Sequence, residues 1–453
     1  MIKKVRTLKE LKTFPRGGVH PPENKLTASS AIEVLPLPKT VIIPVAQHIG
    51  APAVVTVNKG DKVLAGQLIA KAGGFISANV HSSVSGTVSK IDTAMDSSGY
   101  KQTCIFIDVS GDEWISDIDR SPSLVKEIRH TPEEIVQRCQ DAGIVGMGGA
   151  TFPTHVKLKI PAGKKCDLLI INGVECEPFL TSDHRLMLEK GEEIITGTRI
   201  MMKALGVSRA VIGIENNKRD AAARLESLLN GTGDITVQTL KVKYPQGGEK
   251  QLIKAVTGRE VPSGGLPVDT GVIVHNAGTA FAVYEAIQKN KPLFERVVTV
   301  TGKSLSKPGN FLVRIGTSVS DLIAAAGGVP EDTGKVVSGG PMMGKALGST
   351  NVPVVKGTSG IVVFPGAMTE RNKYGPCIRC SRCIAACPMG LEPYLLMSAS
   401  EKGLFEKARK ERITDCMECG SCSYICPANR PLLDYIRLGK STVMRMIREK
   451  SMK

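Results

Sequence analysis

Two short cysteine runs near the C-terminus constrain this chain more than any other feature. Each has the spacing C-x2-C-x2-C-x3-C-P, the first over 377–388 and the second over 416–427. Three thiolates two residues apart can wrap three corners of one small cube, while the fourth points away from its own loop. The pattern predicts two 4Fe–4S clusters that exchange fourth ligands. We expect one cluster on Cys377, Cys380, Cys383 and Cys426, and the other on Cys416, Cys419, Cys422 and Cys387.

A pair of structural zinc sites is the alternative interpretation of these runs. Zinc sites use cysteines in pairs, whereas this chain repeats a run of four cysteines and a proline, which favours iron–sulfur clusters. Cluster ligands must stay reduced, so we expect a reducing compartment and no disulfide framework among the 12 cysteines. Two neighbouring clusters imply that electrons pass one at a time.

Composition narrows the possible partners. The formal net charge of +16 favours anionic partners such as phosphate cofactors, acidic proteins or an anionic membrane face. The basic residues are spread out and not interleaved with aromatic residues, so we expect no nucleic acid. No run approaches 18 apolar residues and no signal peptide is recognisable, so we expect no membrane span. A chain of 453 residues has room for three or four domains.

The first part of the chain reads as two units. Residues 1–30 are rich in proline and glycine, which predicts either a disordered tail or a strap that packs on the next domain. Residues 31–120 read as short alternating strands, and their glycine-punctuated pattern resembles a lipoyl-type barrel-sandwich domain. Such domains carry a modified lysine at a hairpin tip. The tip here, 73–75, is Gly-Gly-Phe, so the resemblance implies a scaffold role.

Residues 121–292 alternate strands with helices, which predicts a largely parallel sheet. Thr131, followed by proline and two acids, marks a helix start. A glycine-rich loop at 146–149 lets the backbone approach a phosphate or a flat ring. Apolar strands at 167–171 and 271–275 end in polar residues, at the sheet edge where α/β proteins bind ligands.

Three motifs in this region resemble the flavin- and NADH-binding subunit of respiratory complex I, in the same order and at similar distances. They are Gly146-x-Gly148-Gly149-x-x-Phe152-Pro-Thr…Lys157, Asn172-Gly-x-Glu175-x-Glu177-Pro and Tyr244-x-x-Gly247-x-Glu249. The resemblance implies a Rossmann-like domain with non-covalent FMN, and NAD(H) as substrate. It assigns FMN to Gly146, Gly148, Gly149, Lys157, Asn172, Tyr244, Gly247 and Asn276. It assigns the nicotinamide nucleotide to Phe152, Glu177 and Glu249, and Glu175 joins the cofactor-binding candidates. Hydride transfer needs no protein acid or base, so we name no catalytic residue.

Four positions depart from that family pattern. Met147 replaces an arginine, Val174 replaces an aspartate and His275 stands where a second asparagine is common. Gly248 replaces the first of two acids. The departures put the FMN contacts at these four positions in question.

The remaining chain divides into four segments. Residues 293–350 resemble the β-grasp (SLBB-like) module that follows the flavin domain in complex I, and a turn at 338–344 resembles that family without an evident chemical role. We expect a linker at 351–366, a dicluster bacterial ferredoxin domain at 367–435 and a basic tail at 436–453. A basic amphipathic tail helix suits an anionic membrane or a partner, and a solvated helix is equally compatible.

The domain order, together with Phe14-Pro-x-Gly-Gly-Val-His-Pro-Pro-Glu23 and Gln47-His-Ile-Gly-Ala-Pro52, resembles the family of C subunits of Rnf (Rsx) ion-translocating oxidoreductases. The resemblance implies a peripheral subunit on the cytoplasmic side of the inner membrane. Its expected partners are the other subunits of a membrane-bound electron-transport complex, including a ferredoxin-type subunit. The implied activity is an NADH-linked flavin and iron–sulfur oxidoreductase that couples electron flow between NAD and ferredoxin to ion transport.

Two rival interpretations remain at this stage. A soluble cobalamin reductase shares the flavin, β-grasp and ferredoxin parts, but there the barrel-sandwich unit tends to follow the clusters. A non-enzymatic iron–sulfur wiring subunit with a vestigial nucleotide fold is the other, and the four departures in the flavin motifs keep it open. A visible spectrum distinguishes these alternatives, because only the enzyme is expected to show flavin bands that bleach when NADH is added.

Overall fold

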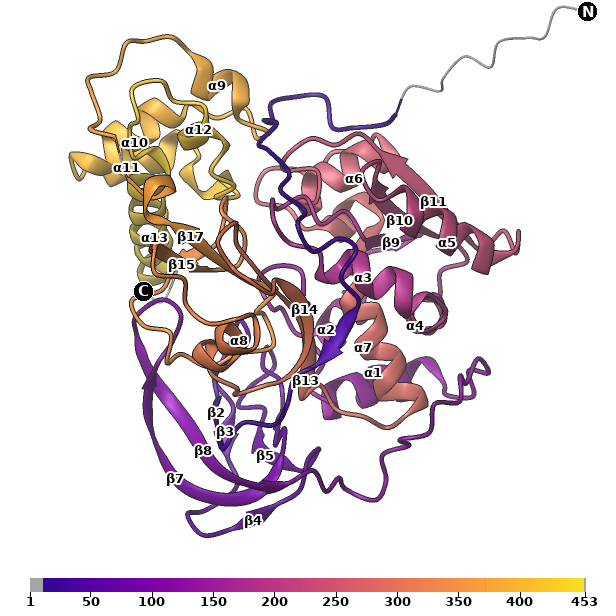
Figure 1. Ribbon diagram of the computed structural model, residues 1–453. Helices are drawn as coiled ribbons and strands as arrows, with labels where there is room; N and C mark the ends of the chain where they lie inside the picture. Colours follow the sequence, from indigo (N-terminus) through magenta and orange to yellow (C-terminus); the bar gives the residue numbers. More distant parts are fainter. Residues whose placement is uncertain (1–10, 371, 452–453) are drawn as a thin grey trace, which may run out of the picture.

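The computed structural model describes residues 11–370 and 372–451. Four units follow one another in the chain: two small antiparallel sheets, a parallel α/β domain, a six-stranded sheet and a helical domain that carries the cysteines. Figure 1 shows the six-stranded sheet in the middle, with the antiparallel sheets below it, the α/β domain on one side and the cysteine-bearing helices above.

The barrel-sandwich unit is built from two antiparallel sheets. The larger joins, in spatial order, β2 (Thr40–Pro44), β8 (Lys101–Gly111), β7 (Ser85–Met95) and β4 (Lys62–Val63). The smaller joins β3 (Val54–Val55), β5 (Leu68–Lys71) and β6 (Val80–His81). Alternating side chains such as Ile43, Ile69 and Ile105 are fully buried between them. The hairpin tip carries Phe75, which is 73% exposed.

A four-stranded parallel sheet forms the core of the α/β domain, in the spatial order β11-β10-β9-β12. The strands are β9 (Leu168–Asn172), β10 (Ala210–Glu215), β11 (Ile235–Leu240) and β12 (Val272–Asn276). The helices are α1 (Pro132–Asp141), α2 (Thr154–Leu158), α3 (Ser182–Glu189), α4 (Gly191–Leu205), α5 (Arg219–Leu229), α6 (Glu249–Thr257) and α7 (Ala277–Gln288). The chain order reverses between β9 and β12, and ligands bind at such reversals.

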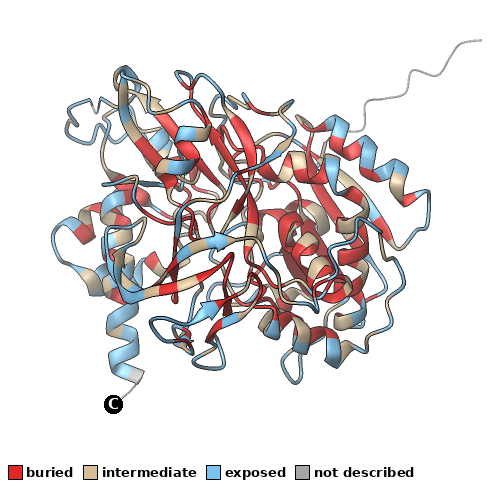
Figure 2. Ribbon diagram, turned by 60° about the horizontal axis from the view of Figure 1, so that its bottom comes forward, coloured by how far each residue is buried: buried red, intermediate tan, exposed pale blue. Residues whose placement is uncertain are grey.

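Helix α1 begins where the sequence predicts. The Thr131 hydroxyl accepts from the Glu134 amide, and the Glu134 carboxylate accepts from the Thr131 amide. This reciprocal pair satisfies two amides that the helix itself leaves free. Ile135 and Cys139 then fall on the buried face. Figure 2 shows the buried residues gathered along the central strands and the inner helix faces.

The six-stranded sheet recruits strands from outside the β-grasp segment. Its order is β1-β14-β13-β17-β15-β16, from β1 (Ile32–Val34), β13 (Glu295–Thr301), β14 (Gly309–Arg314), β15 (Thr333–Ser338), β16 (Lys345–Ala346) and β17 (Gly360–Pro365). Helix α8 (Val319–Ala325) accompanies it. Residues 351–366, expected to be a linker, contain β17, which lies between β13 and β15 with Ile361 and Val362 fully buried. Strand β1, expected to belong to the barrel-sandwich unit, pairs in parallel with β14.

The cysteine-bearing domain is helical. It contains α9 (Arg382–Ala386), α10 (Pro393–Glu401), α11 (Phe405–Lys410), α12 (Ser421–Tyr424) and α13 (Leu432–Ser451). The basic tail continues α13, which buries Ile436 and Val443 in the apolar core that it shares with α10 and α11. The first basic residues of the tail are used internally: Arg437 and Lys440 pair with Glu418 at 3.2 Å and 3.0 Å.

Residues 11–30 form a strap across two domains rather than a tail. The Val19 amide donates to the Tyr244 carbonyl, the Tyr244 amide donates back to Val19, and the Gly18 amide donates to the Ala386 carbonyl. Tyr244 belongs to the α/β domain and Ala386 to the cysteine-bearing domain. In Figure 1 the indigo strap runs between these two domains and ends in β1, beside β14.

A buried lysine joins three parts of the fold. The Lys356 ammonium is 2.7 Å from the carbonyl oxygens of Asn79, in the barrel-sandwich unit, and Gly143, in the α/β domain. Its side chain is almost fully buried and burial lowers its pKa to about 7. His48 and His81 lie near it, and burial and the Lys356 charge lower the pKa of both imidazoles. Above pH 7 these histidines are neutral and leave Lys356 to titrate.

Stability is expected to rise with pH above neutrality because of Lys356. Between the lowered pKa in the folded chain and the ordinary lysine value, the unfolded chain binds one more proton, so the slope is up to about 1.4 kcal/mol per pH unit. Below the lowered pKa both states are protonated and this contribution is flat. Thermal unfolding at stepped pH should show a shallower rise in Lys356→Met than in the exposed control Lys59→Met. Equal slopes in the two variants would contradict the assignment.

Candidate functional site

Four of the predicted ligands surround one small cavity. Its walls are formed by Cys387 from the first run and by Cys416, Cys419 and Cys422 from the second, with apolar neighbours that include Leu391 and Ile436. Cys387, Cys419 and Cys422 are buried and Cys416 is half-buried. We call this set the inner site. Among the described residues, no group of three metal-binding side chains is close enough to hold a single ion. Four thiols around one cavity are the donor set of a 4Fe–4S cluster.

The other four cysteines form a more open group, the outer site. Cys377 and Cys380 are exposed, while Cys383 and Cys426 are half-buried. Burial raises the pKa of Cys383, and the charge of a Cys426 thiolate also raises it. The structure thus brings Cys387, the fourth cysteine of the first run, to the second run.

Both runs wrap in the same way. The second residue after the first cysteine is left-handed in each, with φ 54° at Arg379 and 59° at Glu418. The residue after the second cysteine is also left-handed, with φ 58° at Ser381 and 79° at Gly420. Residues other than glycine, such as Arg379, Ser381 and Glu418, rarely adopt this conformation. Its repetition at matched positions indicates that both loops curl around an object of the same shape.

Three flavin candidates meet at the sheet edge where β9 and β12 end. Asn172 is the last residue of β9, and its amide donates to the Gly247 carbonyl at 2.9 Å. Asn276 ends β12 and caps α7 by accepting from the Gly278 amide. The Lys157 ammonium lies 2.7 Å from a Glu249 carboxylate oxygen and 2.6 Å from the Val274 carbonyl.

The glycine loop covers this edge. The Gly146 amide donates to the Phe152 carbonyl, which closes the loop and holds half-buried Phe152 at its end. A Cβ on Gly148 would lie 2.7 Å from the Asn276 amide nitrogen, so only glycine fits there. A Cβ on Gly149 would meet nothing within 4 Å, so its backbone faces open space.

The donors at this edge suit an anionic ligand with a flat ring. Lys157 supplies a point charge, and Asn172 and Asn276 supply amides beside an exposed glycine backbone. The buried polar atoms of the described residues that have no hydrogen-bond partner include Thr154 Oγ1 and His275 Nε2. Burial holds the pKa of His275 well below its usual range, and the Lys157 charge lowers it further, so its imidazole is neutral. FMN is compatible with this donor set.

The two acidic candidates Glu175 and Glu177 bind different parts of the fold. The Glu175 carboxylate accepts from the amides of Asp183 at 2.8 Å and His184 at 3.2 Å, so it caps α3. The Glu177 carboxylate instead accepts from the amides of Met342 at 3.1 Å and Met343 at 2.9 Å. The turn at 338–344, which has no evident role in the sequence, therefore anchors Glu177. Burial raises the pKa of Glu177 to about 7.

Tyr244 and Gly247 lie on the loop that follows β11. The Tyr244 hydroxyl donates to the Cys419 carbonyl at 2.8 Å and also lies 3.5 Å from a Glu177 oxygen. The Gly247 amide donates to the Cys176 sulfur at 3.3 Å. The α/β domain thus contacts the inner site directly.

Comparisons with known families assign every unit of the chain. Residues 12–112 match the RnfC barrel-sandwich hybrid domain and 139–285 the Nuo51 FMN-binding domain. Residues 297–346 match the SLBB domain and 370–427 a 4Fe–4S dicluster domain. The order places the barrel-sandwich unit before the clusters. The four-domain organisation predicted from the sequence is confirmed.

Curated relatives match over nearly the whole chain. A Clostridium ljungdahlii protein, the C subunit of the proton-translocating ferredoxin:NAD(+) oxidoreductase complex, is 48% identical over 95% of this chain and 94% of its own length. The chain belongs to the RnfC family of ion-translocating oxidoreductase complexes. An Acetobacterium woodii relative, named for Na(+) translocation, is 42% identical over 96% of this chain and 98% of its own. The family resemblance inferred from the sequence is thereby confirmed.

A solved structure supports the fold of this RnfC-family chain. The air-oxidised NAD+-reducing [NiFe]-hydrogenase matches with a TM-score of 0.50 and 20% identity, over 69% of this chain and 63% of that chain. Within residues 11–370 and 372–451, no helix combines the length and apolar character needed to cross a membrane.

The four departures from the complex I pattern occupy different environments in this RnfC-family chain. Met147 and Val174 are buried in apolar clusters. His275 is buried at the sheet edge. A Cβ at Gly248 would lie 2.5 Å from the Met417 side chain, because the cysteine-bearing domain packs there. Gly248 therefore accommodates the second cysteine run.

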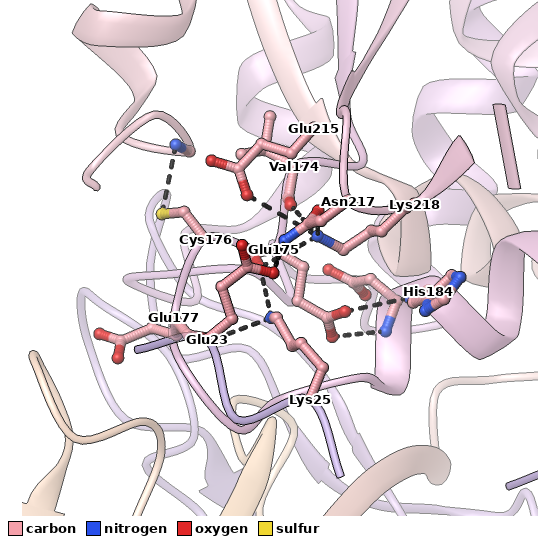
Figure 3. Close-up of polar contacts among 12 residues, drawn as sticks. Glu23, Lys25, Val174, Glu175, Cys176, Glu177, His184, Glu215, Asn217 and Lys218 are labelled. Atoms are coloured by element: carbon pink, nitrogen blue, oxygen red, sulfur yellow. Dashed lines mark hydrogen bonds and ion pairs between the residues drawn. The ribbon is translucent and has the colours of Figure 1, made fainter. Parts of the chain in front are cut away.

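Two lysines that the sequence analysis did not single out hold the loop at 174–180 of this RnfC-family chain. The Lys25 ammonium, from the strap, lies 2.8 Å, 2.9 Å and 2.6 Å from the carbonyl oxygens of Glu175, Glu177 and Leu180. The Lys218 ammonium donates to the Val174 carbonyl at 2.8 Å and is buried. Figure 3 shows both side chains pointing at this loop. Lys218 could have been found from the sequence, because it follows β10 at the sheet edge where α/β domains bind ligands. Lys25 could not, because it lies in an irregular stretch without a recognisable pattern.

Proposed function

We propose that this chain is the NAD(H)-facing electron-transfer subunit of a ferredoxin:NAD+ oxidoreductase complex that translocates ions. The observation that carries the proposal is the contact between the α/β domain and the inner site, where the Tyr244 hydroxyl lies 2.8 Å from the Cys419 carbonyl. The names of the relatives supply the substrates: ferredoxin and NAD(+). A peripheral position on the cytoplasmic side of the cell membrane, among the other subunits of the complex, completes the proposal.

The proposed FMN site comprises Gly146, Gly148, Gly149, Lys157, Asn172, Tyr244, Gly247 and Asn276. FMN, when bound, exchanges hydride with a nicotinamide and single electrons with an iron–sulfur cluster. Lys157 would balance a phosphate charge once its bond to Glu249 is shared or released. Gly148 lets the loop close on Asn276. Phe152, Glu177 and Glu249 remain the candidates for the nicotinamide nucleotide, with Glu177 fixed by the 338–344 turn.

Exposure suggests an order for the two cysteine sites. The inner site is enclosed and touches the α/β domain, whereas Cys377 and Cys380 of the outer site are exposed. We therefore place the inner site next to the flavin and the outer site next to a partner. The outer face carries exposed Ile378 and Tyr374 together with Arg379 and Arg382. A ferredoxin-type subunit is the partner that we expect there.

A visible spectrum of the purified chain, recorded before and after addition of NADH, tests the proposal. Flavin bands that bleach on addition are the expected result. Broad iron–sulfur absorption without flavin bands would instead support a non-enzymatic wiring subunit.

Replacing Lys157 with alanine is expected to weaken FMN binding by about 10- to 100-fold, because a charge-assisted hydrogen bond contributes about 1.5–3 kcal/mol. Iron content should not change, since Lys157 touches no cysteine run. Lys159→Ala, an exposed lysine two residues on, is the matched control. Flavin released on denaturation and total iron measure the two effects. Full flavin occupancy in Lys157→Ala would refute the site assignment.

A further inference from the structure

Tyr244 lies where the strap, the α/β domain and the cysteine-bearing domain meet. Its backbone exchanges two hydrogen bonds with Val19, at 2.8 Å and 2.9 Å. Its side chain is 3% exposed and packs in one apolar cluster with Val19, Ala386 and Cys419. Contacts with the strap and with the cysteine-bearing domain therefore fix the position of the Tyr244 ring.

The Tyr244 hydroxyl points toward the inner site. A phenol has one proton to donate, and the Cys419 carbonyl at 2.8 Å is a better acceptor position than the Glu177 oxygen at 3.5 Å. The Glu177 carboxylate already accepts from two amides of the 338–344 turn. The hydroxyl therefore acts chiefly on the Cys419 carbonyl.

The peptide that follows Cys419 is held on more than one side. Gly420 is left-handed at φ 79°, and a Cβ there would lie 2.8 Å from the Met342 carbonyl. The hydroxyl of Tyr244 adds a donor to the carbonyl of the same peptide. A donor at a carbonyl polarises the peptide and makes its N–H a stronger donor. Hydrogen bonds from N–H groups to the sulfurs of a cluster raise its reduction potential.

The geometry points to Tyr244 as a positioning residue for the inner cluster: its hydroxyl orients the Cys419 peptide and raises the reduction potential of the cluster on the flavin side. The inference rests on the proposed function only in taking Cys387, Cys416, Cys419 and Cys422 as cluster ligands. The equivalent cysteine of the first run, Cys380, is exposed. The effect should therefore be confined to one of the two clusters.

Tyr244→Phe tests the inference because it removes the hydroxyl and keeps the ring. An EPR-monitored redox titration of the intact chain, driven by a chemical reductant, measures both clusters without NADH or flavin. We expect full iron, a midpoint potential shifted downward for one cluster and an unchanged potential for the other. Tyr424→Phe, at a 47% exposed tyrosine within the second run, should shift neither. Full iron with both potentials unchanged in Tyr244→Phe would overturn the inference.

A second variant covers the case in which Tyr244→Phe loses iron through poor folding. A ring-fluorinated tyrosine at position 244 preserves the shape and makes the phenol a stronger donor. The same cluster should then shift upward. A downward shift, or no shift, would overturn the inference. Because reduction is chemical, failure here is distinguishable from failure of the proposed NADH and FMN chemistry.

Discussion

Replacing Cys422 with alanine is expected to lower the iron content from about eight to about four atoms per chain and to cut NADH off from the remaining cluster. Cys422 is 8% exposed and faces the inner cavity with Cys387, Cys416 and Cys419. The inner site is also the one that touches the α/β domain, through Tyr244. Its loss should leave NADH able to bleach the flavin but unable to reduce the outer cluster.

Cys380→Ala is the matched variant at the outer site. It should lose the same amount of iron, yet NADH should still reduce the inner cluster. Cys104→Ala, in the barrel-sandwich unit, should change neither iron nor reduction. Iron analysis and EPR spectra recorded after addition of NADH measure these outcomes. If the outer cluster of Cys422→Ala were reduced by NADH at the unmodified rate, the order of the two sites would be wrong.

Replacing Lys25 with methionine is expected to destabilise the chain by about 3 kcal/mol. The ammonium is the shared donor for the carbonyl groups of Glu175, Glu177 and Leu180, and methionine offers them nothing. The loop that it holds is already strained, since Glu175 and Phe179 are left-handed at φ 44° and 72°. Loss of the donor should therefore release the loop as well as cost stability.

Chemical denaturation followed by far-UV circular dichroism measures the loss. The exposed control Lys39→Met should stay within about 0.5 kcal/mol of the unmodified chain. Lys25→Arg keeps the charge and should retain part of the stability. The loop also carries Glu177, so proteolysis between 174 and 180 should speed up in Lys25→Met alone. Equal stability of Lys25→Met and Lys39→Met would show that the three carbonyl groups find other donors.

Local patterns predicted the parts of the fold that depend on short-range geometry. Spacing within each cysteine run identifies three ligands and a departing fourth, and the structure pairs Cys387 with the second run. The helix start at Thr131 is confirmed, because the cap and the amide of Glu134 that it accepts from lie within one helical turn. Alternating strands and helices likewise predicted the parallel sheet with Asn172 and Asn276 at its edge.

Contacts between residues that are far apart in the sequence could not be predicted from these local patterns. Strand β17 reads as a link between domains because its hydrogen-bond partners, β13 and β15, are recognisable only once the chain is folded. Glu175 and Glu177 look equivalent in sequence, yet one caps α3 and the other is held by amides 165 and 166 residues away. The role of Lys25 was equally unpredictable, because the carbonyl groups that it binds lie at least 150 residues further along the chain.

The strap that crosses between the α/β and cysteine-bearing domains imposes an order on biosynthesis. Its partners Tyr244 and Ala386 are translated hundreds of residues after Val19 and Gly18. At ribosomal speeds of about 5–20 residues per second, the strap waits roughly 20–70 seconds before it can dock. For most of that interval the α/β domain has been synthesised and the cysteine-bearing domain has not, so the proposed flavin site is accessible before the strap docks. Docking of the strap then joins the first domains of the chain to the last one, so it is a late step of folding.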